Sequence, residues 1–362
     1  MNLAYFHFEL PEGLIGQEAI EPRDSCRLLV VHRKTQTLSH HSFRDLLTIL
    51  DSNSVLVLND TKVFPARLFG TKETGGKIEF LLLKQLSLDT FGCIARGKLK
   101  NEQKIIFDAD LIGVVRHCEE RSDSGPACRQ AGIQVTFNFS GPDLLFKLDE
   151  QGKTPLPPYI HSLADEKDLR RDYQTVYAKE KGSAAAPTAG LHFTENILAE
   201  LVARGVQIEK ITLHVGLGTF KPVTADQIAT QTLHSESFWL SAVTASRLNE
   251  AKKAGKKIIA VGTTTCRVLE SQSDATGTLV AGEGETKIFI QPGYKFKFVD
   301  GLITNFHLPE TSLLMLVTAL VSAPNSPITF KNFQDSLIGK AYEEAIEKKY
   351  KFFSFGDAML IL

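Results

Sequence analysis

The spacing of hydrophobic residues changes twice along this 362-residue chain, at about residues 64 and 152. Between those points, short alternating runs are separated by glycine, asparagine and aspartate, and no helical period of useful length occurs. Such a pattern predicts a small antiparallel barrel or sandwich. On both sides of it, apolar runs of strand type alternate with helical patterns, which indicates an α/β sheet with parallel portions. We therefore expect an α/β domain over 1–63 and 153–362, interrupted by an inserted β domain over 64–152.

A polar segment at 116–132 lies within the predicted β domain. It is rich in charge and has no strand periodicity, so we expect a flexible inserted loop. Its two cysteines, Cys118 and Cys128, are too loosely spaced for a zinc knuckle. The five cysteines of the chain are odd in number and scattered, which favours free thiols in a reducing compartment. We expect the protein to be cytoplasmic.

Neither a membrane span nor a signal peptide is predicted. The strongest apolar run, at 313–321, is too short to cross a bilayer, and the first residues lack a basic segment followed by an apolar one. The net charge of -1 gives no overall attraction to nucleic acid, so an RNA contact needs a local basic face. One such face is predicted at 294–298, where Lys295 and Lys297 alternate with aromatic residues as on a strand. A merely solvated strand face is the alternative.

The stretch 172–194 is a loop of unusual composition that precedes a helix. Its centre consists of small residues, and Pro187 and Gly190 oppose a helix there although three alanines would suit one. Thr194 is placed to cap the helix that follows, which we expect to stop at Gly205. Backbone N–H groups at a helix N-terminus favour an anionic ligand. The alternative is a tight loop that serves only packing.

Two further turns follow predicted strands. The buried strand at 55–58 ends in Asn59, Asp60 and Thr61, which can either contact a ligand or form an Asx-turn. The strand at 257–261 runs into a Gly-Thr-Thr-Thr turn that opens a helix, and this geometry also suits an anion. The second signal is weaker than a P-loop because no Gly-Lys-Ser/Thr ending is present.

Four of the ten histidines lie in polar or glycine-containing turns at predicted strand or helix ends. They are His192, His214, His234 and His307. An imidazole titrates near neutral pH, so these positions suit general acid–base chemistry, and a structural hydrogen bond is the alternative for each. Their spacing does not match metal-binding helices. The chain also lacks a G-x-G-x-x-G turn and a G-x-S-x-G elbow, which disfavours a dinucleotide site and a hydrolase.

Several long motifs occur in a distinctive order. They are NDTKVFPARLFGTKETGGKIEFLLL, DYQTVYA, AAAPTAGLHFT, LHVGLGTFKPV, LHSE, VGTTTCRVLES, QPGYKFKFVDGLITNFHLP, SLLMLV and FFSFGDAMLI. With them the chain resembles, over essentially its whole length, the S-adenosylmethionine:tRNA ribosyltransferase-isomerase family of queuosine biosynthesis. Three features depart from the family pattern: the 116–132 insert, Lys287 in place of an aspartate, and Phe355 in place of a tyrosine.

The resemblance implies an α/β domain with a mixed sheet, interrupted by a small antiparallel β-barrel. It also implies that the ribosyl group of S-adenosylmethionine is transferred and isomerised onto 7-aminomethyl-7-deazaguanine at the tRNA wobble position. The products are then epoxyqueuosine-tRNA, adenine and methionine. S-adenosylmethionine is a consumed substrate in this reaction, and no metal or other cofactor is needed. We expect a monomer that acts on tRNA and does not associate with a membrane.

We place S-adenosylmethionine between the 187–192 loop, the 216–220 turn and the helix N-terminus at 263–265, which would hold the methionine carboxylate. The predicted substrate-binding residues are Tyr173, Pro187, Thr188, Gly190, Gly216, Gly218, Thr219, Phe220, His234, Glu236, Thr263, Thr264, Thr265, Arg267 and Asn305.

Proton transfer is assigned to three candidates, His192, His214 and His307, and Asp60 is assigned to hold the aminomethyl group. Two rival functions stay open. One is a non-catalytic tRNA-binding protein of the same fold, which the presence of the loop residues disfavours. The other is a tRNA methyltransferase that uses S-adenosylmethionine, and it would transfer a methyl group without releasing adenine.

Overall fold

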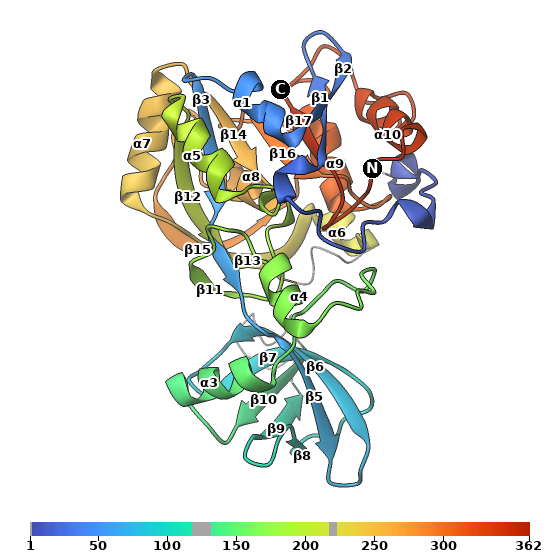
Figure 1. Cartoon of the computed structure of the whole chain (residues 1–362), viewed down its shortest axis with the longest axis vertical. Helices are drawn as coiled ribbons and strands as arrows, with labels where there is room; N and C mark the ends of the chain where they lie inside the picture. Colours follow the sequence, from blue (N-terminus) through green and yellow to red (C-terminus); the bar gives the residue numbers. More distant parts are fainter. Residues whose placement is uncertain (1, 118–131, 217–222) are drawn as a thin grey trace.

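The structure is a computed structural model that describes residues 2–117, 132–216 and 223–362. It consists of a mixed nine-stranded sheet covered by helices and a closed barrel, joined through the region around α4 (Glu166–Asp172) (Figure 1). The barrel has the strand order β10-β7-β6-β5-β8-β9, and every pairing in it is antiparallel. Its strands are β5 (Arg67–Lys72), β6 (Lys77–Gln85), β7 (Thr90–Arg96), β8 (Gln103–Ile106), β9 (Ile112–His117) and β10 (Ile133–Phe137).

The nine-stranded sheet has the order β15-β13-β12-β3-β14-β16-β17-β1-β2. Its strands are β1 (Arg27–His32), β2 (Thr37–Ser42), β3 (Ser54–Asn59), β12 (Gln207–Leu213), β13 (Thr232–Leu240), β14 (Lys257–Val261), β15 (Gly282–Ile288), β16 (Gly301–Asn305) and β17 (Ala358–Ile361). Strands β12, β3, β14 and β16 are parallel neighbours, and β1 is parallel to β17. The remaining pairings are antiparallel, so the sheet is mixed as expected.

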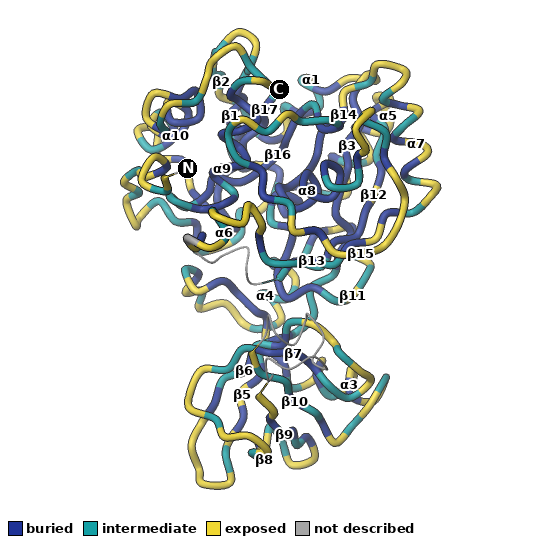
Figure 2. Tube along the Cα trace, turned by 180° about the vertical axis from the view of Figure 1, so that it is seen from behind, coloured by how far each residue is buried: buried dark blue, intermediate teal, exposed yellow. Residues whose placement is uncertain are grey.

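Helices cover both faces of this sheet. Alternate residues of β3 belong to different cores: Val55 and Val57 pack into one, and Leu56 and Leu58 into the other. The first core includes α7 (Ala242–Lys253), α8 (Thr263–Ser271), α9 (Ser312–Leu320) and α10 (Leu337–Glu347). The second includes α1 (Leu46–Ile49) and α5 (Glu195–Ala203). Figure 2 shows these central strands buried, with exposed turns around them.

Several boundaries predicted from the sequence are confirmed. The β14 strand spans the predicted range, and α5 begins after Thr194, whose side chain accepts a hydrogen bond from the backbone N–H of Ile197 at 3.2 Å. The remaining helices are α3 (Gly141–Gln151), which follows the barrel strands, and α6 (Ala225–Thr230). Of the predicted insert, Arg116 belongs to β9, and 118–131 lie outside the described residues.

The predicted strand at 294–298 is wrong. This segment forms no strand because the carboxylate of Glu270 on α8 binds its backbone. The backbone N–H groups of Lys297, Phe298 and Val299 donate to Glu270 at 2.9 to 3.0 Å. The Lys297 ammonium donates to the carbonyl of Ser273, so the two lysines do not form a basic strand face.

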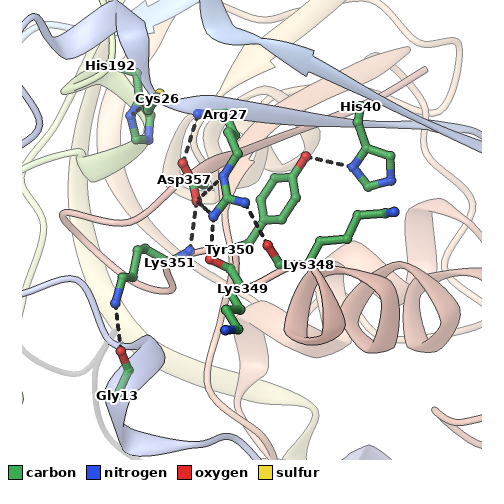
Figure 3. Close-up of polar contacts among 10 residues, drawn as sticks. All are labelled: Gly13, Cys26, Arg27, His40, His192, Lys348, Lys349, Tyr350, Lys351 and Asp357. Carbon is green, nitrogen blue, oxygen red and sulfur yellow. Dashed lines mark hydrogen bonds and ion pairs between the residues drawn. The ribbon is translucent and has the colours of Figure 1, made fainter.

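A buried carboxylate, Asp357, fixes the segment that leads into β17 (Figure 3). It accepts hydrogen bonds from the backbone N–H groups of Arg27 and Lys351, both at 2.8 Å, and from the Arg27 guanidinium at 2.9 Å. The same guanidinium lies 4.1 Å from the centre of the Tyr350 ring. These contacts tie the start of β1 to the turn before β17, and that turn carries Phe353 and Ser354.

Across residues 2–117, 132–216 and 223–362, no helix combines the length and the apolar character that crossing a bilayer requires.

Candidate active site

The candidate site lies where four neighbouring parallel strands end. His214 follows β12, Asp60 follows β3, Gly262 follows β14, and His307 lies two residues beyond β16. Because these strands are parallel and adjacent, their carboxyl ends meet at one edge of the sheet. Predicted residues that are far apart in sequence are thereby brought to a single edge.

A pocket opens at the carboxyl ends of β14 and β16. Of the predicted residues, those that line it are Pro187, Thr188, Thr263, Thr264, Asn305 and His307. The pocket is also lined by residues from other parts of the chain that were not predicted, among them Tyr159, Phe353 and Ser354. Phe353 and Ser354 belong to the FFSFGDAMLI motif, which was a usable signal, whereas nothing in the sequence marked Tyr159.

The N-terminus of α8 forms part of the pocket wall. Gly262 precedes it with φ +91°, a left-handed conformation that glycine adopts without strain, and no side chain caps the helix. The Thr265 hydroxyl donates to the carbonyl of Val261 at 2.7 Å and is fully buried, so it contacts the strand rather than the pocket. Thr263 and Thr264 instead line the pocket. Uncapped N–H groups at this position favour an anionic group.

His307 is the only one of the three histidine candidates for proton transfer that lines this pocket. Its Nε2 lies 2.8 Å from the Thr304 hydroxyl, and its backbone N–H donates to the Tyr342 hydroxyl at 2.8 Å. Within the part of the chain that the structure describes, Nδ1 has no hydrogen-bond partner. Burial lowers the pKa of this imidazole to about 3, so the ring is neutral at pH 7.

His192 does not line the pocket, and both of its ring nitrogens are occupied. The Asn305 amide donates to Nε2 at 2.9 Å, and Nδ1 lies 3.2 Å from the sulfur of Cys26. The same Asn305 accepts a hydrogen bond from the Thr188 hydroxyl at 2.9 Å. His192 therefore positions Asn305, and through it Thr188, on the wall of the pocket. Burial lowers the pKa of His192 to about 4, and the positive charge of Arg23 adds to this effect.

Replacing His192 with glutamine is expected to make folding less sensitive to acid. The imidazole pKa is about 4 in the folded protein against 6.5 without perturbation, so between these values the unfolded chain binds more protons. The contribution of the neutral His192 side chain to folding stability is therefore fully present above pH 6.5 and is lost as the pH falls toward 4. The loss between pH 7 and pH 5 should shrink by about 2 kcal/mol in the variant. Urea unfolding at both pH values measures this, and an unchanged loss would contradict the assignment.

Asp60 and His214 lie near each other, after the carboxyl ends of β3 and β12, and neither lines the pocket. Asp60 accepts a hydrogen bond from the Thr212 hydroxyl at 2.7 Å, and burial raises the pKa of its carboxyl. Nδ1 of His214 lies 2.8 Å from the Thr61 hydroxyl, and burial lowers the pKa of this imidazole. The His214 ring stands against Gly182, where an added Cβ would come within 2.7 Å of it.

A buried ionic cluster links β13 to α8. The Arg267 guanidinium pairs with the carboxylate of Glu236, whose other oxygen lies 3.6 Å from Nε2 of His234. Both members of the pair are 2 % exposed. Nε and Nη2 of Arg267 have no hydrogen-bond partner among the described residues. None of the three side chains lines the pocket.

Three other predicted substrate-binding residues that the structure describes, Tyr173, Gly190 and Gly216, are also outside the pocket lining. Tyr173 lines a separate groove at the junction with the barrel, and Gly190 packs against the Tyr177 hydroxyl, which a Cβ would approach to 2.0 Å. Gly216 is half-buried at the end of a described segment. The predicted residues Gly218, Thr219 and Phe220 lie outside the described residues. Among the residues that the structure describes, no group of three or more His, Cys, Asp or Glu side chains could hold a metal ion.

A family model described as queuosine biosynthesis protein matches residues 3–361. The chain belongs to this family.

Similar proteins span the whole chain. It is 47% identical to an S-adenosylmethionine:tRNA ribosyltransferase-isomerase of Symbiobacterium thermophilum, and 100% of both chains is covered. A protein with the same description from Clostridioides difficile is also 47% identical with 100% of both chains covered. Among solved structures, an S-adenosylmethionine tRNA ribosyltransferase from Thermotoga maritima is 34% identical. That comparison covers 99% of this chain and 100% of the other, with a TM-score of 0.53.

Proposed function

We propose that this protein is an S-adenosylmethionine:tRNA ribosyltransferase-isomerase of queuosine biosynthesis. The observation that carries the proposal is the 47% identity, over the full length of both chains, to two proteins with that description. The substrates are S-adenosylmethionine and a tRNA that carries 7-aminomethyl-7-deazaguanine at the wobble position. The products are epoxyqueuosine-tRNA, adenine and methionine. The protein acts as a cytoplasmic monomer without a metal or another cofactor, and it consumes S-adenosylmethionine.

The reaction follows from the chemistry of the sulfonium. The positive sulfur acidifies the adjacent 5′ carbon, so removal of a proton there forms an ylide. Adenine then departs, the tRNA amine attacks the ribose fragment, and an epoxide closes as methionine leaves. The protein must stabilise changing charge at each step and keep water from the reactive intermediates.

The pocket residues suit these tasks. The uncapped N-terminus of α8, at Thr263 and Thr264, binds the methionine carboxylate. Apolar lining residues such as Phe306 and Leu313 limit the access of water. His307 moves a proton through Nδ1, which has no hydrogen-bond partner among the described residues, and the low pKa of its ring favours passing that proton on to the departing adenine.

Asp60 holds the aminomethyl group of the tRNA base in this proposal. Its carboxylate lies at the same sheet edge, after β3, while β14 separates it from β16. The ribose fragment therefore has to lie between the pocket and Asp60. His214, beside Asp60, contributes to the tRNA side of the site rather than to the S-adenosylmethionine pocket.

The deciding experiment uses chromatography to measure the release of adenine from S-adenosylmethionine. Purified protein is incubated with tRNA that carries the aminomethyl base, and the matched control is the same tRNA with guanine at the wobble position. Release that depends on the modified tRNA supports the proposal. Methyl transfer without adenine release would instead establish a methyltransferase, and tRNA binding without either reaction would establish a binding protein.

A further inference from the structure

Two lysines lie side by side on a short ribbon that leads from the α/β part into the barrel. The ribbon consists of β4 (Thr61–Val63) and β11 (Glu180–Ser183), which pair in parallel. Lys62 is the partner of Lys181 in this register, so the two side chains leave the same face. Neighbouring strands are about 4.8 Å apart, so these two like charges start from directly opposite positions and repel each other.

These two lysines lack the carboxylate partners that nearby cations have. Lys179 pairs with Glu180 at 3.0 Å, and Arg170 pairs with Glu166 at 3.0 Å. Among the described residues, neither lysine of the ribbon has a hydrogen bond or an ion pair through its side chain. Two adjacent, unpaired cations are most stable when an anion lies between them.

Lys62 also lines a groove of about 460 Å³ between the barrel and the α/β part. We call it the junction groove; its walls include Arg23, Lys62, Pro65, Thr154, Gln174 and Thr175. The Gln174 side chain holds the ribbon in place, because it donates to the carbonyl of Val63 and accepts from its N–H at 3.1 and 3.0 Å. The Thr175 hydroxyl is buried at the groove wall with no hydrogen-bond partner among the described residues.

We propose that Lys62 and Lys181, together with the junction groove, bind the phosphate backbone of the substrate tRNA. This inference rests on the proposed function. Asp60, which we assign to the aminomethyl group, lies only two residues before Lys62. Two residues of extended chain span about 7 Å, so a nucleotide whose base reaches Asp60 has its own phosphates within reach of the ribbon. Lysine suits this role because it binds phosphate as a point charge without reading sequence.

The test is the salt dependence of tRNA binding by the Lys62→Ala/Lys181→Ala double variant. The slope of log K against log salt is negative, and each lost phosphate contact should reduce its magnitude by about one. We therefore expect a slope that is less negative by about two in the double variant. The KM for tRNA should rise, whereas the KM for S-adenosylmethionine should stay unchanged. The matched control replaces two exposed lysines by alanine, Lys253 at the end of α7 and Lys257 at the start of β14. Equal slopes for wild type and the ribbon variant would overturn the proposal.

A charge reversal separates phosphate binding from a structural role. Lys181→Glu places opposite charges on neighbouring strands, so the thermal unfolding temperature should be unchanged or higher. Binding of tRNA should nevertheless weaken more than in Lys181→Ala. If the variant binds tRNA as the wild type does, the ribbon is not a phosphate site.

The outcomes also distinguish the inference from the function on which it rests. Wild-type protein that binds tRNA through these lysines but releases no adenine would contradict the proposed function and leave the surface standing. Adenine release with unchanged tRNA affinity in the lysine variants would contradict only the surface.

Discussion

Replacing His307 with alanine is expected to lower kcat for adenine release by about 10²- to 10⁴-fold, the usual cost of losing a group that transfers a proton in the transition state. The imidazole lines the pocket, and its Nδ1 has no hydrogen-bond partner among the described residues. The KM for S-adenosylmethionine should change little, because in our proposal the α8 N-terminus rather than the imidazole binds the carboxylate. Steady-state kinetics with saturating modified tRNA measure both constants.

Two comparisons make this result specific. His161 is exposed and outside the pocket, so His161→Ala should retain wild-type kcat. Thr304→Val removes the hydroxyl that lies 2.8 Å from Nε2 of His307 and should lower kcat by a smaller factor through misplacing the ring. A kcat within tenfold of wild type for a folded His307→Ala protein would rule out proton transfer by this residue.

Breaking the buried Arg267–Glu236 pair should have the largest effect on stability. Glu236→Gln leaves the Arg267 guanidinium buried without its counter-charge, and the free energy of unfolding should fall by about 3–5 kcal/mol. Urea unfolding at pH 7 measures the change. A loss below about 1 kcal/mol, the range of an exposed pair, would show that water reaches the guanidinium.

The double variant Arg267→Met/Glu236→Leu tests whether Arg267 binds substrate in addition to stabilising the fold. Replacing both charges with apolar side chains of similar volume should restore most of the lost stability. Nε and Nη2 of Arg267 are buried and have no hydrogen-bond partner in the described part of the protein. If this guanidinium binds S-adenosylmethionine, the stable double variant loses affinity in calorimetric titration. Retained affinity would assign Arg267 to folding alone.

The sequence predicted the edge of the sheet where the candidate site lies, because strand ends have a local signature. Asp60 and Thr263 each follow a run of buried residues and begin a polar turn, and the structure places both turns at the same edge. Strand order was not needed for that prediction, since the carboxyl ends of parallel neighbours meet in any order.

The environment of a side chain could not be predicted in the same way. His192 and His307 look alike in sequence, because each lies between a leucine and a phenylalanine. Only distant residues distinguish them: Cys26, 166 positions away, and Asn305, 113 positions away, occupy both nitrogens of His192. The alternation at 294–298 was misleading for a related reason, because Glu270 binds the backbone that a neighbouring strand would otherwise pair with.

The position of β17 has a consequence for how a nascent chain acquires this sheet. β17 follows every other strand in sequence, yet it lies between β16 and β1. The hairpin of β1 and β2 is synthesised first and joins the sheet only through β17. During translation, the hairpin therefore keeps an unpaired edge until β17 has been made and has left the ribosome. Until then, the exposed β1 edge is a point at which newly made chains are open to chaperones or to mispairing.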